Sequence, residues 1–409
     1  MATFPTPPEW MRRGPLREGT FRPNLHDERT ASLIGTALGV AFGLAFATGL
    51  ISHYEQHPPG WLPLPTHPVW FYRFTQGVHV ASGLAAIPLL LAKLWTVYPR
   101  LFSWPPVKSV LHALERLSIA VLVAGAVFEL VTGLQNIAQW YPWHFPFVPA
   151  HYRVAWITVG ALLLHLAVKA PAIARGLRNR PAVAEPDPSE PASLPRSDAA
   201  VAADAVPARP GAVSRRVLIG STAFAVLAVT ATTIGQSVTS LRFLDFLGVR
   251  SPHDGPQGVP INRTAAQAHV LTSAVDPSWA LEVDGPRPYL LSLAELRAMP
   301  QVHARLPIAC VEGWSTENQT WTGVRLADLA KMAGVPEPSS VLTRSLQKGG
   351  AFSRAVMSQA QIIDPDSLLA LQVNGADLTL DHGYPARVIV PDAPGVHNTK
   401  WVSSLTFRR

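Results

Sequence analysis

Long apolar stretches constrain the fold of this chain more than any other feature. A helix needs roughly 20 residues to cross about 30 Å of hydrocarbon. Five stretches reach or approach that length, and they cover residues 31–51, 74–92, 117–134, 154–168 and 217–241. The fourth is the shortest and can be extended by Tyr152 and Lys169 at its two ends. The sequence therefore predicts a membrane α-helical bundle of four helices, with a fifth helix as an added anchor.

Positive charge predicts the orientation of these helices, because Lys and Arg are retained in cytoplasmic segments. Cations gather in residues 1–30, in 93–116 and in 169–216, whereas only Arg73 and Arg153 lie in the connections after the first and third stretches. We therefore expect a cytoplasmic N-terminus and an extracytoplasmic segment after the fifth helix. The net charge of +7 follows these helix ends, which indicates contact with membrane lipid and not with nucleic acid.

The expected domains follow the composition: a cytoplasmic arm (1–30), a cytochrome b-like four-helix bundle (31–175), a linker (176–213), the fifth helix (214–242) and a soluble domain (243–409). The linker is rich in Pro, Ala, Asp, Glu and Ser, a composition that cannot bury a core and predicts a disordered cytoplasmic segment. It ends in S-R-R-V-L-I at 214–219. This run resembles a twin-arginine export motif, and paired arginines that only anchor the helix are the alternative.

A short internal repeat favours duplication of the first two helices as the third and fourth. A-T-G-L at 47–50 is followed by a Trp/Pro-rich loop and Tyr72-Arg73, and V-T-G-L at 131–134 is followed by another such loop and Tyr152-Arg153.

Histidines inside these stretches predict a functional bundle, because an ionisable side chain in a membrane is costly. His79 and His165 are the best candidates as haem ligands, although their depths differ by roughly 9 Å. Such imidazoles resemble the axial ligands of quinone-coupled membrane b-type cytochromes, and the chain has no C-x-x-C-H for covalent haem. Hydrogen bonds between helices are the alternative role. Other candidates lie nearer the two surfaces or in the outer loops: His53, His112, His67, His144 and His151.

The last part of the chain has the pattern of an α+β domain. Strands are expected at 279–285, 303–310, 341–346, 386–390 and 401–407, with short helices at 294–299 and within 321–334. The second strand delivers Cys310, the only cysteine of the chain, at or near its end. One cysteine excludes intramolecular disulfides, thiolate iron–sulfur clusters and all-cysteine zinc sites.

Three motifs occur in this domain in a fixed order. They are A-C-V-E-G-W-S at 309–315 with W-T-G-V-R-L-A-D-L at 321–329, then N-G-A-D-L-T-L-D-H-G-Y-P-A-R-V-I-V-P at 374–391, and G-V-H-N-T-K-W at 395–401. The set resembles the molybdopterin domain of the sulfite oxidase family, and most of all its periplasmic methionine sulfoxide reductase type. The resemblance covers about residues 257–409.

This resemblance implies a molybdenum held by one molybdopterin dithiolene and by Cys310, since a soft thiolate suits such a metal. It implies that Arg387 and Lys400 grip the cofactor phosphate. Arg305 and His303 lie a few residues before the thiol and are candidates to line the substrate mouth, with exposed strand residues as the alternative. The further cofactor contacts that the resemblance implies are Asn262, Ser345, His382, Asn398 and Thr399. His382 stands where the methionine sulfoxide reductase type has asparagine, and one extra residue separates Cys310 from Trp321, so the pocket shape differs.

The resulting hypothesis is a membrane-bound molybdopterin oxidoreductase that performs oxygen-atom transfer on an S-oxide, N-oxide or sulfite type of substrate. Electrons would be exchanged with quinone through a haem-bearing bundle, or with a redox partner protein. Two other classes stay open at this point. One is a hydrolase or transferase with Cys310 as nucleophile and His382 or His397 as base, and the other is a non-catalytic anchored binding module.

Overall fold

The computed structural model describes residues 25–178 apart from 60 and 63, residues 214–409 apart from 249, 251–254 and 351, and residues 6 and 9. Contacts divide the chain into two compact units. The first comprises Met1–Phe42, Ala85–Leu130 and Arg153–Ala228, and the second comprises Gly43–Leu84, Val131–Tyr152 and Val229–Arg409. Most of the cytoplasmic arm and of the linker expected at 176–213 lies outside the described residues.

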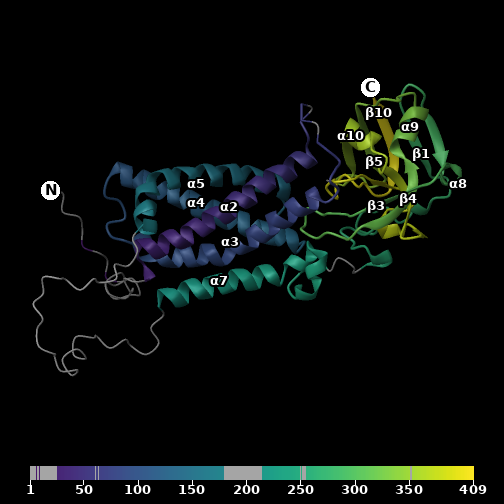
Figure 1. Ribbon diagram of the computed structural model, residues 1–409. Helices are drawn as coiled ribbons and strands as arrows, with labels where there is room; N and C mark the ends of the chain where they lie inside the picture. The colour runs from purple at the N-terminus through teal and green to yellow at the C-terminus, as the bar shows by residue number, and fades with distance from the viewer. Residues whose placement is uncertain are drawn as a thin grey trace, which may run out of the picture. The chain divides into compact units, whose positions relative to one another are not determined.

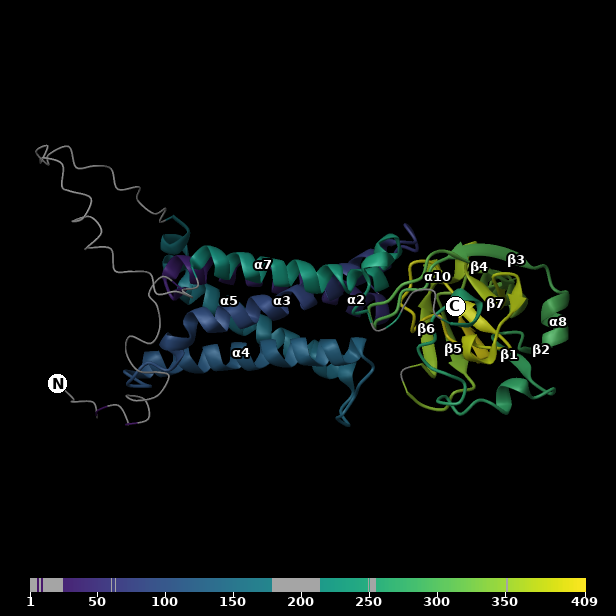
Figure 2. The same cartoon turned by 90° about the horizontal axis from the view of Figure 1, so that it is seen from below.

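Five helices in the described part of the chain are long and apolar enough to cross a membrane, and the five predicted stretches fall on them. Figures 1 and 2 show each of them as a long helical ribbon. They are α2 (Glu28–Gln56), α3 (Phe71–Leu101), α4 (Val110–Ile137), α5 (Phe147–Arg178) and α7 (Arg215–Ala231).

Two helix ends differ from the sequence prediction. Helix α5 begins at Phe147, and Pro149 in its first turn fits because the early N–H groups of a helix have no intrahelical acceptor. His151 is therefore a helical residue and not a loop residue. Helix α7 ends at Ala231, and the 3₁₀ helices η2 (Ile234–Gln236) and η3 (Thr239–Leu244) follow where the sequence predicts more α-helix.

The first unit is held together by an apolar cluster and by ion pairs. Side chains of α2, α3, α4 and α7 form the cluster: Ile34, Leu38, Ala41, Phe42, Ala86, Leu89, Ala92, Leu130, Leu218 and Val226. Arg215 pairs with Asp27 at 3.3 Å, and Lys169 pairs with Glu115. Partly exposed pairs of this kind contribute little stability, roughly 0–1 kcal/mol each, so packing dominates.

The second unit contains two five-stranded sheets. One has the order β2-β1-β10-β5-β6, and the other has β3-β4-β7-β8 with β9 paired to β7. The strands of the first are β1 (Ala280–Asp284), β2 (Tyr289–Ser292), β5 (Ser340–Ser345), β6 (Arg354–Ser358) and β10 (Val402–Arg408). Those of the second are β3 (Val302–Leu306), β4 (Gln319–Arg325), β7 (Leu368–Val373), β8 (Ala376–Asp377) and β9 (Arg387–Ile389). All pairings are antiparallel except β1 with β10.

One apolar core joins the two sheets with their short helices α8 (Leu293–Ala298), α9 (Leu326–Met332) and α10 (Gln359–Ile363). Strand β1 shows why: Leu281 and Val283 are fully buried while their neighbours face out, which is the period of a half-buried strand. Strand β7 is buried on both faces, as expected for a central strand that is covered on both sides.

The expected α+β class agrees with this domain. The predicted strands at 279–285, 341–346, 386–390 and 401–407 overlap β1, β5, β9 and β10, and the helix at 294–299 overlaps α8. The stretch 321–334 is mixed, since β4 occupies its start and α9 its middle, and Gly334 ends the helix with φ +80°. Strand β3 stops at Leu306, so Cys310 lies in the loop beyond it.

Candidate active site

Cys310 lies in a tight turn that follows β3. Its N–H donates to Trp314 O at 2.9 Å, and Gly313 N–H donates back to Cys310 O at 3.0 Å. Gly313 has φ +98°, a conformation that glycine adopts without the steric cost of a side chain. The neighbouring Ala309 bridges to Ser315 and to Pro394, so the turn is tied to the loop that carries the 395–401 motif.

The thiol is buried with only 2% of the residue exposed. Burial raises the pKa of Cys310 well above its ordinary value, and the negative charge of Glu312 raises it further. A thiol in this environment is a poor nucleophile by itself, because the thiolate is the reactive form. Binding of a metal cation deprotonates a coordinating thiol outright, so the same environment suits a metal ligand.

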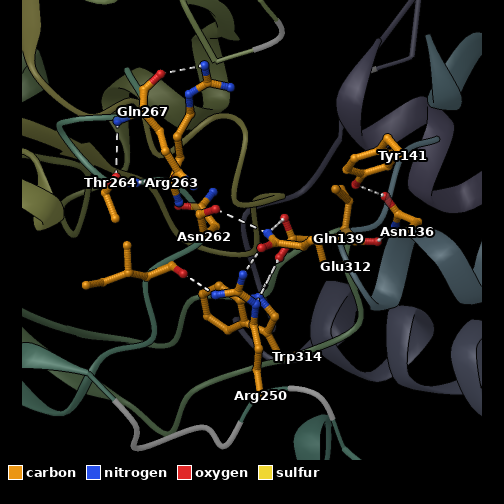
Figure 3. Close-up of polar contacts among 12 residues, drawn as sticks. Asn136, Gln139, Tyr141, Arg250, Asn262, Arg263, Thr264, Gln267, Glu312 and Trp314 are labelled. Atoms are coloured by element: carbon orange, nitrogen blue, oxygen red, sulfur yellow. Dashed lines mark hydrogen bonds and ion pairs between the residues drawn. The ribbon is translucent and has the colours of Figure 1, made fainter. Parts of the chain in front are cut away.

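Glu312 is part of a polar network (Figure 3). Trp314 Nε1 donates to Glu312 Oε2 at 3.0 Å, and Arg250 Nε lies 3.6 Å from the same oxygen. Gln139, in the loop after α4, donates from Nε2 to Glu312 Oε1 at 2.5 Å and to Asn262 O at 3.1 Å. Gln139 has φ +52°, which turns the chain sharply beyond the helix end.

A small pocket, called the cavity below, lies beside this turn. Gly395 borders it, and a Cβ on Gly395 would lie 3.5 Å from Cys310 Cα. The lining residues are Asn262, Arg263, Gln347, Phe352, Arg387, Gly395, Val396, Asn398, Thr399, Lys400 and Trp401. The predicted motif residues from 387 to 400 therefore converge on one site.

Two buried cations border this cavity. Arg387 on β9 lies over the Trp321 ring, with 5.5 Å from Cζ to the centroid, and burial lowers its pKa to about 10. Lys400 Nζ donates to Arg263 O at 2.5 Å and to Asp381 O at 2.9 Å. Burial and the charge of Arg387 lower the pKa of Lys400 well below its ordinary value. Both shifts arise because a positive charge is costly away from water, and an anion in the cavity would offset that cost.

Unsatisfied donors in the cavity wall fit such an anion. Within the described residues, these buried atoms have no hydrogen-bond partner: Arg263 Nε, Arg387 Nε, Asn398 Nδ2 and Thr399 Oγ1. Buried polar atoms are almost always paired, so orphaned ones need an explanation. Charged and neutral donors around one cavity match the acceptor oxygens of a phosphate. The donors of this wall therefore fit a phosphate-bearing group.

Two predicted cofactor contacts, Ser345 and His382, do not line the cavity but bond to residues that do. Ser345 Oγ donates to Lys400 O at 2.7 Å, so it fixes the backbone of the lysine. His382 is buried, its Nε2 donates to Pro256 O at 2.6 Å, and its carbonyl accepts from Arg387 Nη1 at 3.4 Å. Neither residue lines the cavity, and both support residues that do.

Arg305 does not line the cavity. It lies on the exposed face of β3, whose alternation turns Ala304 and Leu306 into the core. His303 shares that outer face and bonds Thr322 Oγ1 through Nδ1 at 2.8 Å. A role for Arg305 at a substrate mouth stays a prediction.

Sequence reasoning missed several residues of the site. Arg263 follows the predicted Asn262 directly, so its signal was at hand. Gln347 and Phe352 come from the loop after β5, and Gln139 and Arg250 come from segments outside the motifs. No motif marked these residues, because only the folded chain brings them to the cavity.

A second group that can hold a metal lies in the helices. His79 on α3 and His151 on α5 have ring centroids 6.3 Å apart and planes at 76°. His79 Nδ1 donates to Ala45 O at 2.8 Å, which leaves the lone pair of this imidazole on Nε2. His151 Nδ1 lies 3.2 Å from Thr132 Oγ1.

The internal repeat flanks both rings. Thr48 Oγ1 lies 3.5 Å from His79 Nδ1, as Thr132 Oγ1 lies beside His151. A Cβ on Gly49 would lie 3.1 Å from His79 Cε1, and a Cβ on Gly133 would lie 3.8 Å from His151 Cε1. The T-G pairs of the two repeats therefore occupy equivalent places beside the two imidazoles. His165 is 14 residues beyond His151 on α5, about 21 Å along the helix axis, so His151 is the partner of His79.

Residues 268–409 match the family model described as "Oxidoreductase molybdopterin binding domain". An uncharacterized oxidoreductase of Bacillus subtilis (strain 168), YuiH, is 32% identical over 133 residues, which are 32% of this chain and 66% of that protein. Sulfite oxidase of Gallus gallus is 32% identical over 164 residues, 33% of this chain and 36% of that protein.

The sulfane dehydrogenase SoxCD of Paracoccus pantotrophus matches at a TM-score of 0.30 and 24% identity, over 32% of this chain and 38% of that one. The chain thus spans less than two thirds of the length of the relatives that it matches. The matched segment contains the two sheets, Cys310 and all residues that line the cavity except Asn262 and Arg263. Residues 268–409 of this chain are a molybdopterin-binding oxidoreductase domain of the sulfite oxidase type.

Proposed function

We propose that the chain is a membrane-bound, molybdopterin-dependent oxidoreductase that adds an oxygen atom to a small substrate or removes one from it. The observation that carries the proposal is the placement of the lone thiol, Cys310, beside a cavity walled by unsatisfied hydrogen-bond donors. Sulfite and the S-oxides and N-oxides are the substrate classes that fit this chemistry, and sulfite oxidases among the relatives favour a sulfur substrate.

The residues divide into two roles. Cys310 would hold the molybdenum, and Arg263, Arg387, Asn398 and Thr399 would hold the phosphate of the pterin. When bound, the metal supplies a two-electron centre that can carry an oxygen atom. Burial of the thiol and the packing of the turn exclude bulk water from the thiolate, which protects a sulfur ligand from oxidation and protonation.

Membrane insertion and orientation are part of the proposal. Five apolar helices support it, as does the concentration of Lys and Arg at one set of helix ends. In this arrangement the N-terminus is cytoplasmic, and the molybdopterin domain is extracytoplasmic. Reporter fusions at the C-terminus and in the 176–213 linker test it: activity of an export-dependent reporter at the linker would contradict the orientation.

We further propose that His79 and His151 hold one haem that exchanges electrons with quinone. An iron bound by two imidazole nitrogens at about 2 Å each would place the ring centroids roughly 6 Å apart, and the two rings lie at 6.3 Å. The bond from His79 to the Ala45 carbonyl supports this role, since ligating histidines usually donate their other N–H to such an acceptor. A dithionite-reduced spectrum of the detergent-solubilised protein tests it through the b-type band.

A cysteine hydrolase fits the site less well. The raised pKa of Cys310 disfavours the thiolate that a nucleophile needs. His382 Nε2 donates to Pro256 O and His397 Nε2 donates to Gln56 O at 3.2 Å, so only Nδ1 of each imidazole keeps a lone pair that could act as a base.

The decisive experiment measures metal and activity in the same sample. Protein from a host that makes the cofactor should contain molybdenum in a one-to-one ratio and should turn over one of sulfite, dimethyl sulfoxide or trimethylamine N-oxide with a redox dye. Metal-free wild-type protein from such a host would overturn the proposal and leave a non-catalytic anchored module.

A further inference from the structure

The turn that carries Cys310 is held by side chains from the helical segments of the same compact unit. The carbonyl of Val311, one peptide bond from Cys310, accepts hydrogen bonds from Gln76 Nε2 on α3 at 3.2 Å and from Asn136 Nδ2 on α4 at 3.0 Å. A carbonyl oxygen has two lone pairs, so this oxygen is saturated by the two helices.

The rest of the turn is held in the same way. Ser237 Oγ donates to Gly313 O, and Ser315 N–H donates to Gln236 O at 2.8 Å. Figure 3 shows Gln139 reaching Glu312 and Asn136 reaching toward the same turn. The backbone from 311 to 315 is therefore fixed by residues outside the two sheets.

One turn of α3 meets both this loop and the paired histidines. Gln76, His79 and Val80 lie within one helical turn and share a face. Gln76 bonds Val311, Val80 packs against Gly313, and His79 contacts α2 and His151. A Cβ on Gly313 would lie 2.8 Å from Val80 Cγ2, so the close approach of loop and helix requires a glycine.

We propose that the Gln76–Val311 hydrogen bond is the junction through which electrons pass between the histidine pair and Cys310, within one chain. The inference rests on the proposed haem and molybdenum sites. Electrons tunnel more efficiently along covalent and hydrogen bonds than across gaps, and this route runs through one turn of α3, one hydrogen bond and one peptide unit. Gln76 and Asn136 do not line the cavity, so the proposal gives their bonds a role in electron transfer and not in holding the metal.

The overall reaction balances through this junction. Oxidation of a quinol to a quinone releases two electrons and two protons. Reduction of an S-oxide consumes two electrons and two protons, breaks the S–O bond, and releases the sulfide and water. A haem passes one electron at a time, so each turnover uses the junction twice.

The test compares Gln76→Leu with a matched control, Thr66→Val. Thr66 Oγ1 donates to Asp364 Oδ2 at 2.6 Å, so the control also removes a hydrogen bond between a helix-flanking segment and the sheet domain, but away from the Cys310 turn. In each protein, stopped flow would follow the reoxidation of pre-reduced haem after addition of dimethyl sulfoxide. If the enzyme oxidises sulfite instead, the same experiment would follow the reduction of oxidised haem after addition of sulfite. Dye-driven turnover, molybdenum content and the haem band are measured alongside.

We expect severalfold slower haem oxidation or reduction in Gln76→Leu, unchanged dye-driven turnover, and wild-type behaviour of Thr66→Val. Asn136→Leu should act in the same direction. In the wild type the haem rate should not depend on protein concentration, which shows transfer within one chain. Unchanged haem kinetics in both Leu variants would overturn the junction while the two metal sites stand. A parallel fall of dye-driven turnover and molybdenum content would also overturn it, because the bonds would then be purely structural. A wild type without a haem band removes the proposed haem, and the junction with it.

Discussion

The cofactor cavity draws its donors from neighbouring stretches of one sheet domain, whereas the histidine pair draws its imidazoles from two separate helices. Arg387 and Asn398 belong to motifs that lie close together in the sequence, so the cavity leaves a readable signature. His79 and His151 have no shared motif, and only the packing of α3 against α5 brings them together. A site made from adjacent segments can be recognised from the sequence, whereas a site made by helix packing is recognised only in the three-dimensional structure.

The two sites also differ in whether their polar atoms have hydrogen-bond partners within the protein. Both histidines have their Nδ1 atoms bonded within the protein, to Ala45 and beside Thr132. The cavity instead has orphaned donors at Arg387, Asn398 and Thr399. An anion in the cavity would satisfy these donors, while the histidine pair is oriented by groups of the protein itself.

Replacement of the thiol gives the largest expected effect. Cys310→Ser should lose molybdenum and all oxygen-atom transfer, because a hydroxyl is a hard, weakly acidic ligand where the metal needs a soft thiolate. Metal analysis and dye-coupled turnover measure the loss. The haem band should persist, since no histidine is touched. Retention of molybdenum at the wild-type level would show that the cavity alone holds the metal centre.

Histidine variants separate the two possible haem pairs. His151→Ala should abolish the b-type band, because it removes one of the two imidazoles proposed to hold the haem. His165→Ala, a matched control on the same helix α5, should keep the band. Reduced-minus-oxidised spectra check both. The opposite result would favour the pair His79–His165. The T-G pairs beside His79 and His151 would then not mark the haem ligands.

Much of the fold and of the cavity was predictable from the sequence. Apolar length identified the five helices, the alternation of apolar residues identified β1, and the motifs pointed to Arg387 and Lys400, which line the cavity. Each of these depends on local chemistry that one segment carries by itself. The central strand β7, L-L-A-L-Q-V, was missed because a strand buried on both faces has no alternation.

The differences between sequence and structure have specific physical causes. Arg305 is near Cys310 in sequence, but strand alternation places it on the exposed face of β3, outside the cavity lining. His151 was assigned to a loop because the hydropathy of its segment is weak, although α5 begins before it. Gln76 and Gln139 contact the Cys310 turn through tertiary structure alone, and no local pattern could reveal them.

Arginine variants compare a cavity residue with an exposed one. Arg387→Met removes a charged donor from the cavity, and hydrogen bonds to charged groups contribute about 1.5–3 kcal/mol each. We expect cofactor affinity to fall by about 10- to 100-fold, seen as lower molybdenum occupancy after dialysis. Arg305→Ala changes an exposed side chain on β3 and should leave occupancy unchanged. A loss in Arg305→Ala equal to that in Arg387→Met would return Arg305 to the site.

The smallest expected effect concerns the support behind the cavity wall. Burial lowers the pKa of His382 from 6.5 to about 4, so the fold prefers the neutral imidazole. Its stabilisation is fully present above pH 6.5 and is lost as the pH falls through the window from 6.5 to about 4, because the unfolded chain binds the proton first. Between pH 7.5 and pH 5 this loss is about 2 kcal/mol.

The variant His382→Asn keeps a donor for the Pro256 carbonyl but cannot titrate in this range. The difference in Tm between pH 7.5 and pH 5 should therefore be smaller in His382→Asn than in the wild type, by a few degrees on the scale of about 2–4 °C per kcal/mol. Thermal unfolding of the detergent-solubilised protein measures this difference in Tm. Other groups whose pKa is lowered, such as His397, contribute equally in both proteins, so their effect cancels in the comparison. Equal pH dependence in the two proteins would mean that His382 is as easily protonated in the fold as in the unfolded chain, and its bond to Pro256 would then not restrict the imidazole to its neutral form.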